Sequence, residues 1–148
     1  MWTVRVQIED FDVGAEDERL QGASPEVGAV VSFVGTVRGG EVRSMTLEHY
    51  PGMTEKALTA YGAQAAERFG LADWRIIHRH GRLGVGEPIM MVATAARHRA
   101  AAFQAAEYLM DWLKSRAPFW KREIGPDGPG DWVAAQTGDE DALARWQG

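Results

Sequence analysis

Apolar and polar residues alternate with a two-residue period in several short stretches of the chain. Residues 2–11 place valine and isoleucine on one side, which is typical of a half-buried strand. Residues 28–38 are almost continuously apolar, so we expect a strand covered on both faces. Residues 42–50 follow a Gly-Gly pair, and we expect them to form a hairpin with the preceding strand.

Strand patterns return in the second half of the chain. Residues 73–96 contain two of them, separated by "GRLGVGE", which we interpret as a turn because it does not open a helix. Residues 119–124 and 131–136 are predicted to be short strands around the turn "GPDGPG".

Two segments have the spacing of long helices. Residues 51–70 begin near a proline and end at a glycine, and residues 98–117 carry the strongest apolar stripe. Shorter helical segments are predicted within residues 12–27 and 139–146. The order of elements predicts one α+β domain over residues 1–148, with two main helices against a mostly antiparallel sheet.

Composition narrows the classes of function. Hydrophobic residues make up 45% of the chain and charged residues 25%, as in ordinary globular proteins. The net charge of -5 argues against a nucleic-acid partner. There is no cysteine, which excludes disulfides and a cysteine nucleophile. No apolar run reaches the roughly 20 residues of a membrane span, and the N-terminal residues lack a secretory pattern, so we expect no membrane partner and a cytoplasmic location.

Positive side chains gather in "LMDWLKSRAPFWKRE", residues 109–123. Lys114 lies near the predicted helix end, and Lys121 follows the Ala-Pro turn. If the returning strand packs beside the helix, both lysines would face one pocket for an anion. The alternative is that Lys114 pairs with Asp111 and complements the negative helix end, while Lys121 and Arg122 are simply exposed.

Cations also crowd the start of the second long helix, where they oppose the helix dipole. Arg97, His98 and Arg99 would fit a bound phosphate or carboxylate there, or they could simply face water. Arg38 follows an apolar strand beside two glycines, where backbone can approach a ligand closely, although a lone arginine is a weak signal.

The histidines do not predict a metal site. His78 and His80 lie two residues apart without carboxylates at ligand spacing. Trp112, Trp120 and Trp132 are expected in the core or an interface, and one of them could stack on a flat ring at a pocket wall.

Several longer motifs resemble those of one family. "GAVVSFVGTVR", "LEHYPGMTEKAL", "IHRHGRLGVGE", "HRAAAF" and "LKSRAPFWKRE" occur in order, followed by "WV" and a terminal "RW". Together they are similar to the large, catalytic subunit of molybdopterin synthase, the MoaE family. The resemblance runs from about residue 28 to residue 146.

The resemblance implies an α/β-hammerhead type of α+β fold and a homodimer within a heterotetramer. Each chain would bind a small ubiquitin-like sulfur-carrier subunit of the MoaD type, whose Gly-Gly tail ends in a thiocarboxylate. The substrate would be cyclic pyranopterin monophosphate, which receives two sulfurs to form the dithiolene of molybdopterin. No cofactor is implied, because the partner supplies the sulfur.

The resemblance also implies roles for individual residues. Lys114 would act at the thiocarboxylate, and Lys121 would be a second catalytic cation. The implied substrate-binding residues are Arg38, His98, Arg99 and Arg122. Three features differ from many relatives: Thr36 and Gln136 stand where some carry a cation, and the loop at residues 39–44 is short.

Two other functions fit the same residues. A non-catalytic module could dock a ubiquitin-like tail without turnover. A small-anion enzyme could act on a phosphorylated metabolite without any partner.

Overall fold

The computed structural model describes residues 2–133 and 137–146, whose strands form two four-stranded sheets. The first sheet has the order β1-β4-β6-β2, and the second has the order β5-β3-β7-β8. Only the β1–β4 pair is parallel among these pairings, so the mostly antiparallel α+β prediction is confirmed. The first sheet comprises β1 (Thr3–Gln7), β2 (Ala29–Thr36), β4 (Asp73–Arg79) and β6 (Pro88–Ala96), and the second comprises β3 (Ser44–His49), β5 (Gly81–Gly84), β7 (Phe119–Gly125) and β8 (Gly128–Pro129).

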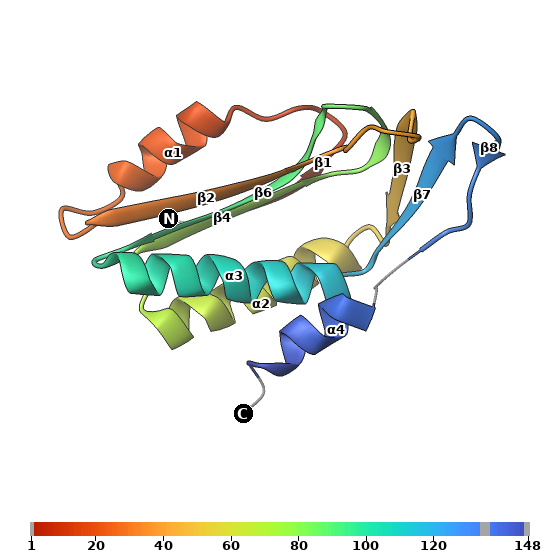
Figure 1. Cartoon of the computed structure of the whole chain (residues 1–148). Helices are drawn as coiled ribbons and strands as arrows, with labels where there is room; N and C mark the ends of the chain where they lie inside the picture. The colour runs from red at the N-terminus through yellow and green to blue at the C-terminus, as the bar shows by residue number, and fades with distance from the viewer. Residues whose placement is uncertain (1, 134–136, 147–148) are drawn as a thin grey trace.

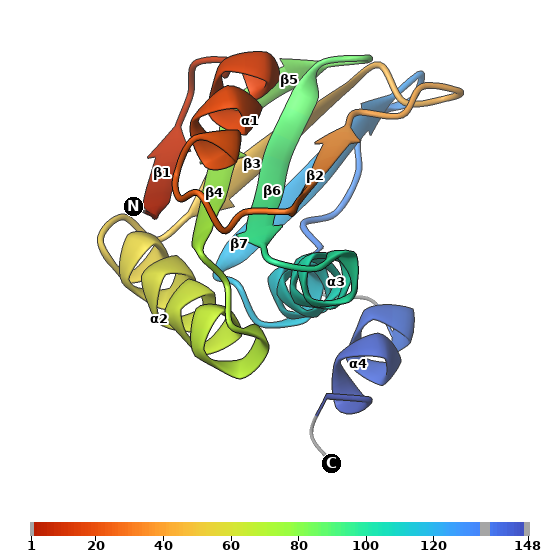
Figure 2. The same ribbon diagram turned by 90° about the vertical axis from the view of Figure 1, so that its left-hand side faces the viewer.

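Helices cover both faces of the first sheet (Figures 1 and 2). The two predicted main helices, α2 (Met53–Phe69) and α3 (Arg99–Ser115), pack on one face, and α1 (Val13–Gln21) packs on the other. A further helix, α4 (Thr137–Ala144), lies against α3. Every residue of β4 is buried between these layers, including the polar side chains of Asp73, Arg75, His78 and Arg79. Among the described residues, no helix is long and apolar enough to cross a membrane.

The predicted hairpin between residues 28–38 and 42–50 is wrong. β2 pairs with β6 in the first sheet, whereas β3 pairs with β5 and β7 in the second. The glycine-containing connection carries the chain from one sheet to the other, because Val37 is buried in the core of the second sheet with Met45, Leu47 and Leu83. Sequence spacing alone suggested a tight turn, but burial of Val37 determines where the chain goes.

Two predicted turn and strand assignments also change. The first four residues of "GRLGVGE" form β5 instead of a turn, so residues 73–96 contain three strands rather than two. In the predicted strand 131–136, Val133 makes a single antiparallel bridge to Lys121. Residues 134–136, including Gln136, lie outside the described part of the chain.

A glycine sets the distance between α2 and the first sheet. A Cβ atom added to Gly62 would lie 2.1 Å from the ring of Trp74 on β4. Gly62 is buried, and Trp74 is only 3% exposed, so neither side can move into solvent. The helix therefore approaches the sheet at a distance that only glycine permits.

We expect Gly62→Ala to lower the free energy of unfolding by about 1–3 kcal/mol, because the added methyl group overpacks the contact with Trp74. Gly14→Ala in α1 is the matched control, since its Cβ would meet only the Asp12 carboxylate at 3.5 Å and alanine favours a helix. Urea denaturation of both variants measures the difference. Equal effects at the two positions would contradict the proposed close approach.

Candidate active site

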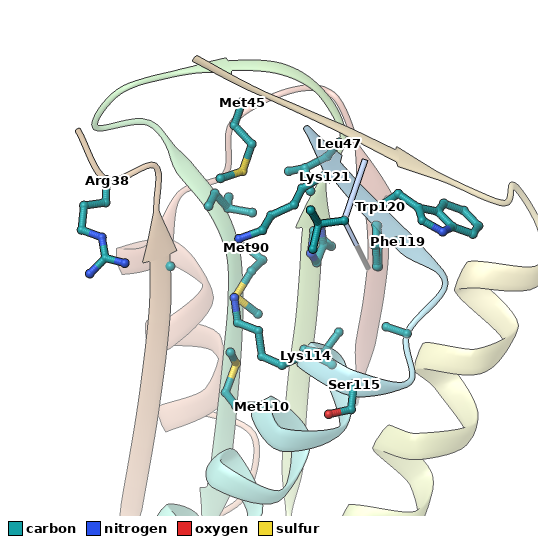
Figure 3. Close-up of a pocket in the computed structure, with 16 residues that line it drawn as sticks. Arg38, Met45, Leu47, Met90, Met110, Lys114, Ser115, Phe119, Trp120 and Lys121 are labelled. Atoms are coloured by element: carbon teal, nitrogen blue, oxygen red, sulfur yellow. The ribbon is translucent and has the colours of Figure 1, made fainter. Parts of the chain in front are cut away.

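A cavity of about 300 Å³ opens where the end of α3 meets β7 and the first sheet (Figure 3). Strands of both sheets and the last turn of α3 contribute to its wall. Its lining residues are Gly35, Arg38, Met45, Leu47, His78, Ile89, Met90, Met110, Leu113, Lys114, Ser115, Ala117, Phe119, Trp120, Lys121 and Val133. Six elements or their ends therefore meet here, although they are far apart in the sequence.

The chain reversal after α3 brings the two lysines together. The helix closes with a 2.7 Å hydrogen bond from the Arg116 amide to the Trp112 carbonyl, and β7 starts only three residues later. Proline at position 118 cannot continue the helical hydrogen-bond pattern. Lys114 and Lys121 consequently extend from opposite sides of the turn toward the same space (Figure 3). The structure thus brings both predicted lysines to one cavity.

The cavity is positively charged. Arg38, at the end of β2, lines it together with the two lysines, and the described lining residues include no aspartate or glutamate. Outside the lining, Glu123 lies 3.8 Å from the Lys121 ammonium group. Lys114 is exposed and Lys121 is about one-third exposed, so both can contact an entering ligand. Such an arrangement favours an anion through direct ion pairing.

Beneath these cations the wall is apolar and soft. Three methionines, Met45, Met90 and Met110, line it (Figure 3). Thioether side chains are polarizable and adapt to irregular shapes, so this wall can fit a flat or sulfur-containing group. Trp120 is held by an edge-on contact with Tyr50, with ring centroids 4.7 Å apart. The cavity therefore combines a cationic rim with an adaptable apolar floor.

His78 lines the cavity, and its sequence context did not predict this role. The sequence raised only the question of a metal ligand. His78 lies on the fully buried strand β4 and is 7% exposed. Its Nδ1–H donates to the Arg79 carbonyl at 2.7 Å, and its ring stacks on Phe119 with centroids 3.7 Å apart. Burial, followed by the charge of Lys114, lowers the pKa of His78 from 6.5 to about 4. The imidazole is therefore neutral at neutral pH.

The available signal for His78 was a polar residue that follows the apolar centre of a predicted strand. The sequence "WRIIHR" places it directly after two isoleucines that are fully buried. A buried polar group needs a partner or a function.

The other predicted site residues lie outside this cavity within one chain. His98 is the residue before α3, and Arg99 is its first residue, at the opposite end of the helix from Lys114. Fifteen residues of helix at 1.5 Å per residue separate Arg99 from Lys114 by about 22 Å. Arg122 lies beside Lys121 in β7 but stacks over the Trp132 ring, with its guanidinium carbon 4.5 Å from the ring centroid.

The alternative interpretation of Lys114 was an ion pair with Asp111, so the partners of Asp111 are relevant. The Asp111 carboxylate accepts hydrogen bonds from Arg145 at 2.6 Å and from the Trp146 indole N–H at 2.6 Å. This carboxylate therefore ties α3 to the residues that follow α4. Within the described parts of the chain, no group of three or more histidine, aspartate or glutamate side chains could hold a metal ion.

A family model, curated relatives and solved structures all match this chain to the same protein family. The family model described as "MoaE protein" matches residues 6–116. A molybdopterin synthase catalytic subunit from Cereibacter sphaeroides is 57% identical over 145 residues, which cover 97% of this chain and 99% of the relative. The solved structure of the molybdopterin biosynthesis MoaE protein from Burkholderia ambifaria is 51% identical, with a TM-score of 0.86 over 100% of this chain and 99% of the other. The crystal structure of molybdopterin synthase from Staphylococcus aureus is 32% identical, with a TM-score of 0.78 over 86% of this chain and 94% of the other.

His78 should make the stability of the protein sensitive to acid. Its pKa of about 4 in the folded chain lies below the ordinary 6.5, so the unfolded chain binds more protons between these values. As pH falls from 6.5 to 4, the free energy of unfolding should therefore lose about 3 kcal/mol through this residue. Urea denaturation of wild type and His78→Phe at pH 7 and pH 4 checks this, because the variant should lose less stability. An identical pH dependence would contradict the assignment.

Proposed function

Because the chain belongs to the MoaE family, we propose that it is the catalytic subunit of a molybdopterin synthase, which transfers sulfur to a pterin phosphate. The substrate is cyclic pyranopterin monophosphate, and the sulfur donor is the C-terminal thiocarboxylate of a small ubiquitin-like subunit. The observation that carries this proposal is the shared cavity of Lys114, Lys121 and Arg38. Phosphate and thiocarboxylate are both anions, and this cavity offers cations to both.

The missing cysteine supports a sulfur donor outside the chain. A sulfurtransferase that carried the sulfur itself would need a thiol, and the sequence has none. A thin Gly-Gly tail could enter the cavity between α3 and β7 and bring the sulfur with it. Capture of a C-terminal acid group by a pocket is a common mode of peptide recognition.

The two lysines have separable roles in this reaction. Lys114, at the end of α3, would lie beside the acyl carbon of the tail, where its ammonium group offsets negative charge as the carbon–sulfur bond breaks. Lys121, on β7, would bind the substrate phosphate or charge that develops on the pterin. Arg38 would be a further phosphate ligand at the end of β2. No cofactor is needed in this scheme, because the sulfur arrives already activated.

The assembly we propose is a homodimer of this chain with one small MoaD-type subunit on each copy, in the cytoplasm. Homodimer formation would explain how Arg99 can contribute to a substrate site although it lies about 22 Å from Lys114 along α3. In a dimer, His98 and Arg99 of one copy could contact the substrate bound at the lysines of the other. Arg122, which stacks on Trp132, would then support the strand that carries Lys121.

Reconstitution tests the function directly. We expect conversion of cyclic pyranopterin monophosphate only when the thiocarboxylated small subunit is added. Product without this subunit would support an enzyme that acts unaided. Tight binding of the subunit without product would support a docking module instead.

Lys114→Ala should reduce this turnover at least a hundredfold, because it removes the cation at the reacting carbon. Its melting temperature should stay close to that of wild type, since Lys114 is exposed. The chain has three lysines, and Lys56→Ala on the exposed side of α2 is the matched control with full activity. Full activity of Lys114→Ala, or equal losses in both variants, would contradict the role of Lys114.

Mixed dimers test whether Arg99 serves the neighbouring copy. Co-expressed Lys114→Ala and Arg99→Ala chains with different tags would give a heterodimer with one intact site and one doubly altered site. We expect this purified heterodimer to recover about half of the wild-type turnover, although each homodimer is nearly inactive. If Arg99 acted on the site of its own chain, both sites of the heterodimer would be damaged and no activity would return.

A further inference from the structure

The imidazole of His78 presents one nitrogen as a fixed hydrogen-bond acceptor. A carbonyl oxygen can only accept, so the 2.7 Å contact between Nδ1 and the Arg79 carbonyl places the ring proton on Nδ1. The second nitrogen, Nε2, then carries a lone pair and no proton. The tautomer is therefore determined by the backbone of β4.

The orientation of the ring is also fixed. His78 stacks on Phe119, with an interplanar angle of 17° and ring centroids 3.7 Å apart. Phe119 is the first residue of β7 and lines the same cavity. The stack thus joins the first sheet to the strand that carries Lys121. Between these contacts the imidazole has little freedom to turn.

Within the described part of the chain, His78 makes its hydrogen bond through Nδ1, and Nε2 is not among the buried atoms that lack a partner, so Nε2 reaches the accessible space of the cavity. An acceptor that faces the space of a cavity binds water when no ligand is present, and a ligand with a donor group can take the place of that water. Because His78 lines the cavity, a ligand bound there can provide that donor group.

The charges around His78 give this acceptor a distinct role. Arg38, Lys114 and Lys121 can only donate hydrogen bonds, and they attract the acidic parts of a ligand. Burial and the positive charge of Lys114 keep the pKa of His78 near 4, so its nitrogen remains an acceptor at neutral pH. The cavity therefore offers donors from its charged side chains and an acceptor from a neutral one.

We propose that His78 accepts, through Nε2, a hydrogen bond from an N–H group of the ligand held in the cavity. This inference rests on the proposed function, in which two ligands carry such a group: the pterin ring and the backbone amide of the carrier tail. A ligand with both an anionic group and an N–H group would match the cavity at both positions. His78 would then orient the reacting group relative to Lys114.

Two amide substitutions separate this role from a purely structural one. The side-chain amide of glutamine reaches the position of Nε2 and can supply an acceptor there, but it leaves the Arg79 carbonyl without its donor. The amide of asparagine lies near the position of Nδ1 and can keep that donor, but it offers nothing at Nε2. The two variants therefore remove opposite halves of the imidazole.

We expect His78→Asn to lower kcat/KM of the reconstituted enzyme about tenfold, and His78→Gln to stay within about threefold of wild type. The reverse order would show that only the bond to Arg79 matters and would overturn the proposal. Equal losses, or no loss in either variant, would also overturn it. His78→Phe keeps an aromatic contact with Phe119 and has no acceptor, so it should lower kcat/KM as much as His78→Asn does. This variant tests the proposal if His78→Asn does not fold.

Binding measurements identify which ligand donates the hydrogen bond to Nε2, and they do not require an active enzyme. Calorimetry with the pterin alone, and separately with the small subunit, compares wild type, His78→Gln and His78→Asn. The ligand whose Kd rises about tenfold only in the asparagine variant is the donor. His80→Asn, two residues along and outside the cavity lining, is the matched control with unchanged binding. Unchanged Kd values for both ligands in all variants would contradict the role of His78. Absence of turnover in the wild-type reconstitution, with these binding differences intact, would contradict only the proposed function.

Discussion

The reversal of the chain between α3 and β7 is the constraint on which the cavity depends. Three residues after Ser115 separate a 17-residue helix from a strand in the other sheet. The helix is fixed by its packing on the first sheet, and the strand is fixed by its pairing with β3. Two rigid elements therefore hold Lys114 and Lys121, and the turn between them leaves little freedom in their relative position. A cation pair on flexible loops would have to be ordered each time a ligand bound.

The junction between the two sheets supplies the remainder of the site. β4 ends at Arg79, and β5 starts at Gly81 in the second sheet, so His78 lies next to the point where the chain changes sheet. Phe119 on β7 stacks on His78 from the other side of this junction. Packing at the junction thus has two effects, because it joins the sheets and also fixes a polar ring at the cavity wall. A substitution there would affect both stability and ligand binding.

Sequence reasoning could find the residues whose placement depends on local rules. The helix end and Pro118 predicted the reversal, and a cavity shared by Lys114 and Lys121 was one of the two interpretations that the nearby sequence allowed. The structure shows that both lysines line one cavity. The hairpin prediction was wrong because β2 pairs with β6, which is distant in the sequence, and no local pattern indicates that pairing. His78 was missed for a similar reason, since its stacking partner is 41 positions away in the chain. The large separation of Arg99 from Lys114 follows simply from helix length, and only the structure shows that α3 is continuous between them.

The exposure of Lys114 gives a physical reason for the dependence on a second subunit in the proposed reaction. In the isolated chain this lysine lines the cavity yet remains open to water, where attraction between charges is weak. A carrier tail that entered the cavity would displace water and cover the ammonium group, and the same charge would then act more strongly on the acyl carbon. The partner would thus bring the sulfur and also complete the low-dielectric environment in which a lysine can stabilise a developing negative charge. The cost of burying that cation would be offset only when the anionic tail end is present, so the site would become reactive when its donor arrives.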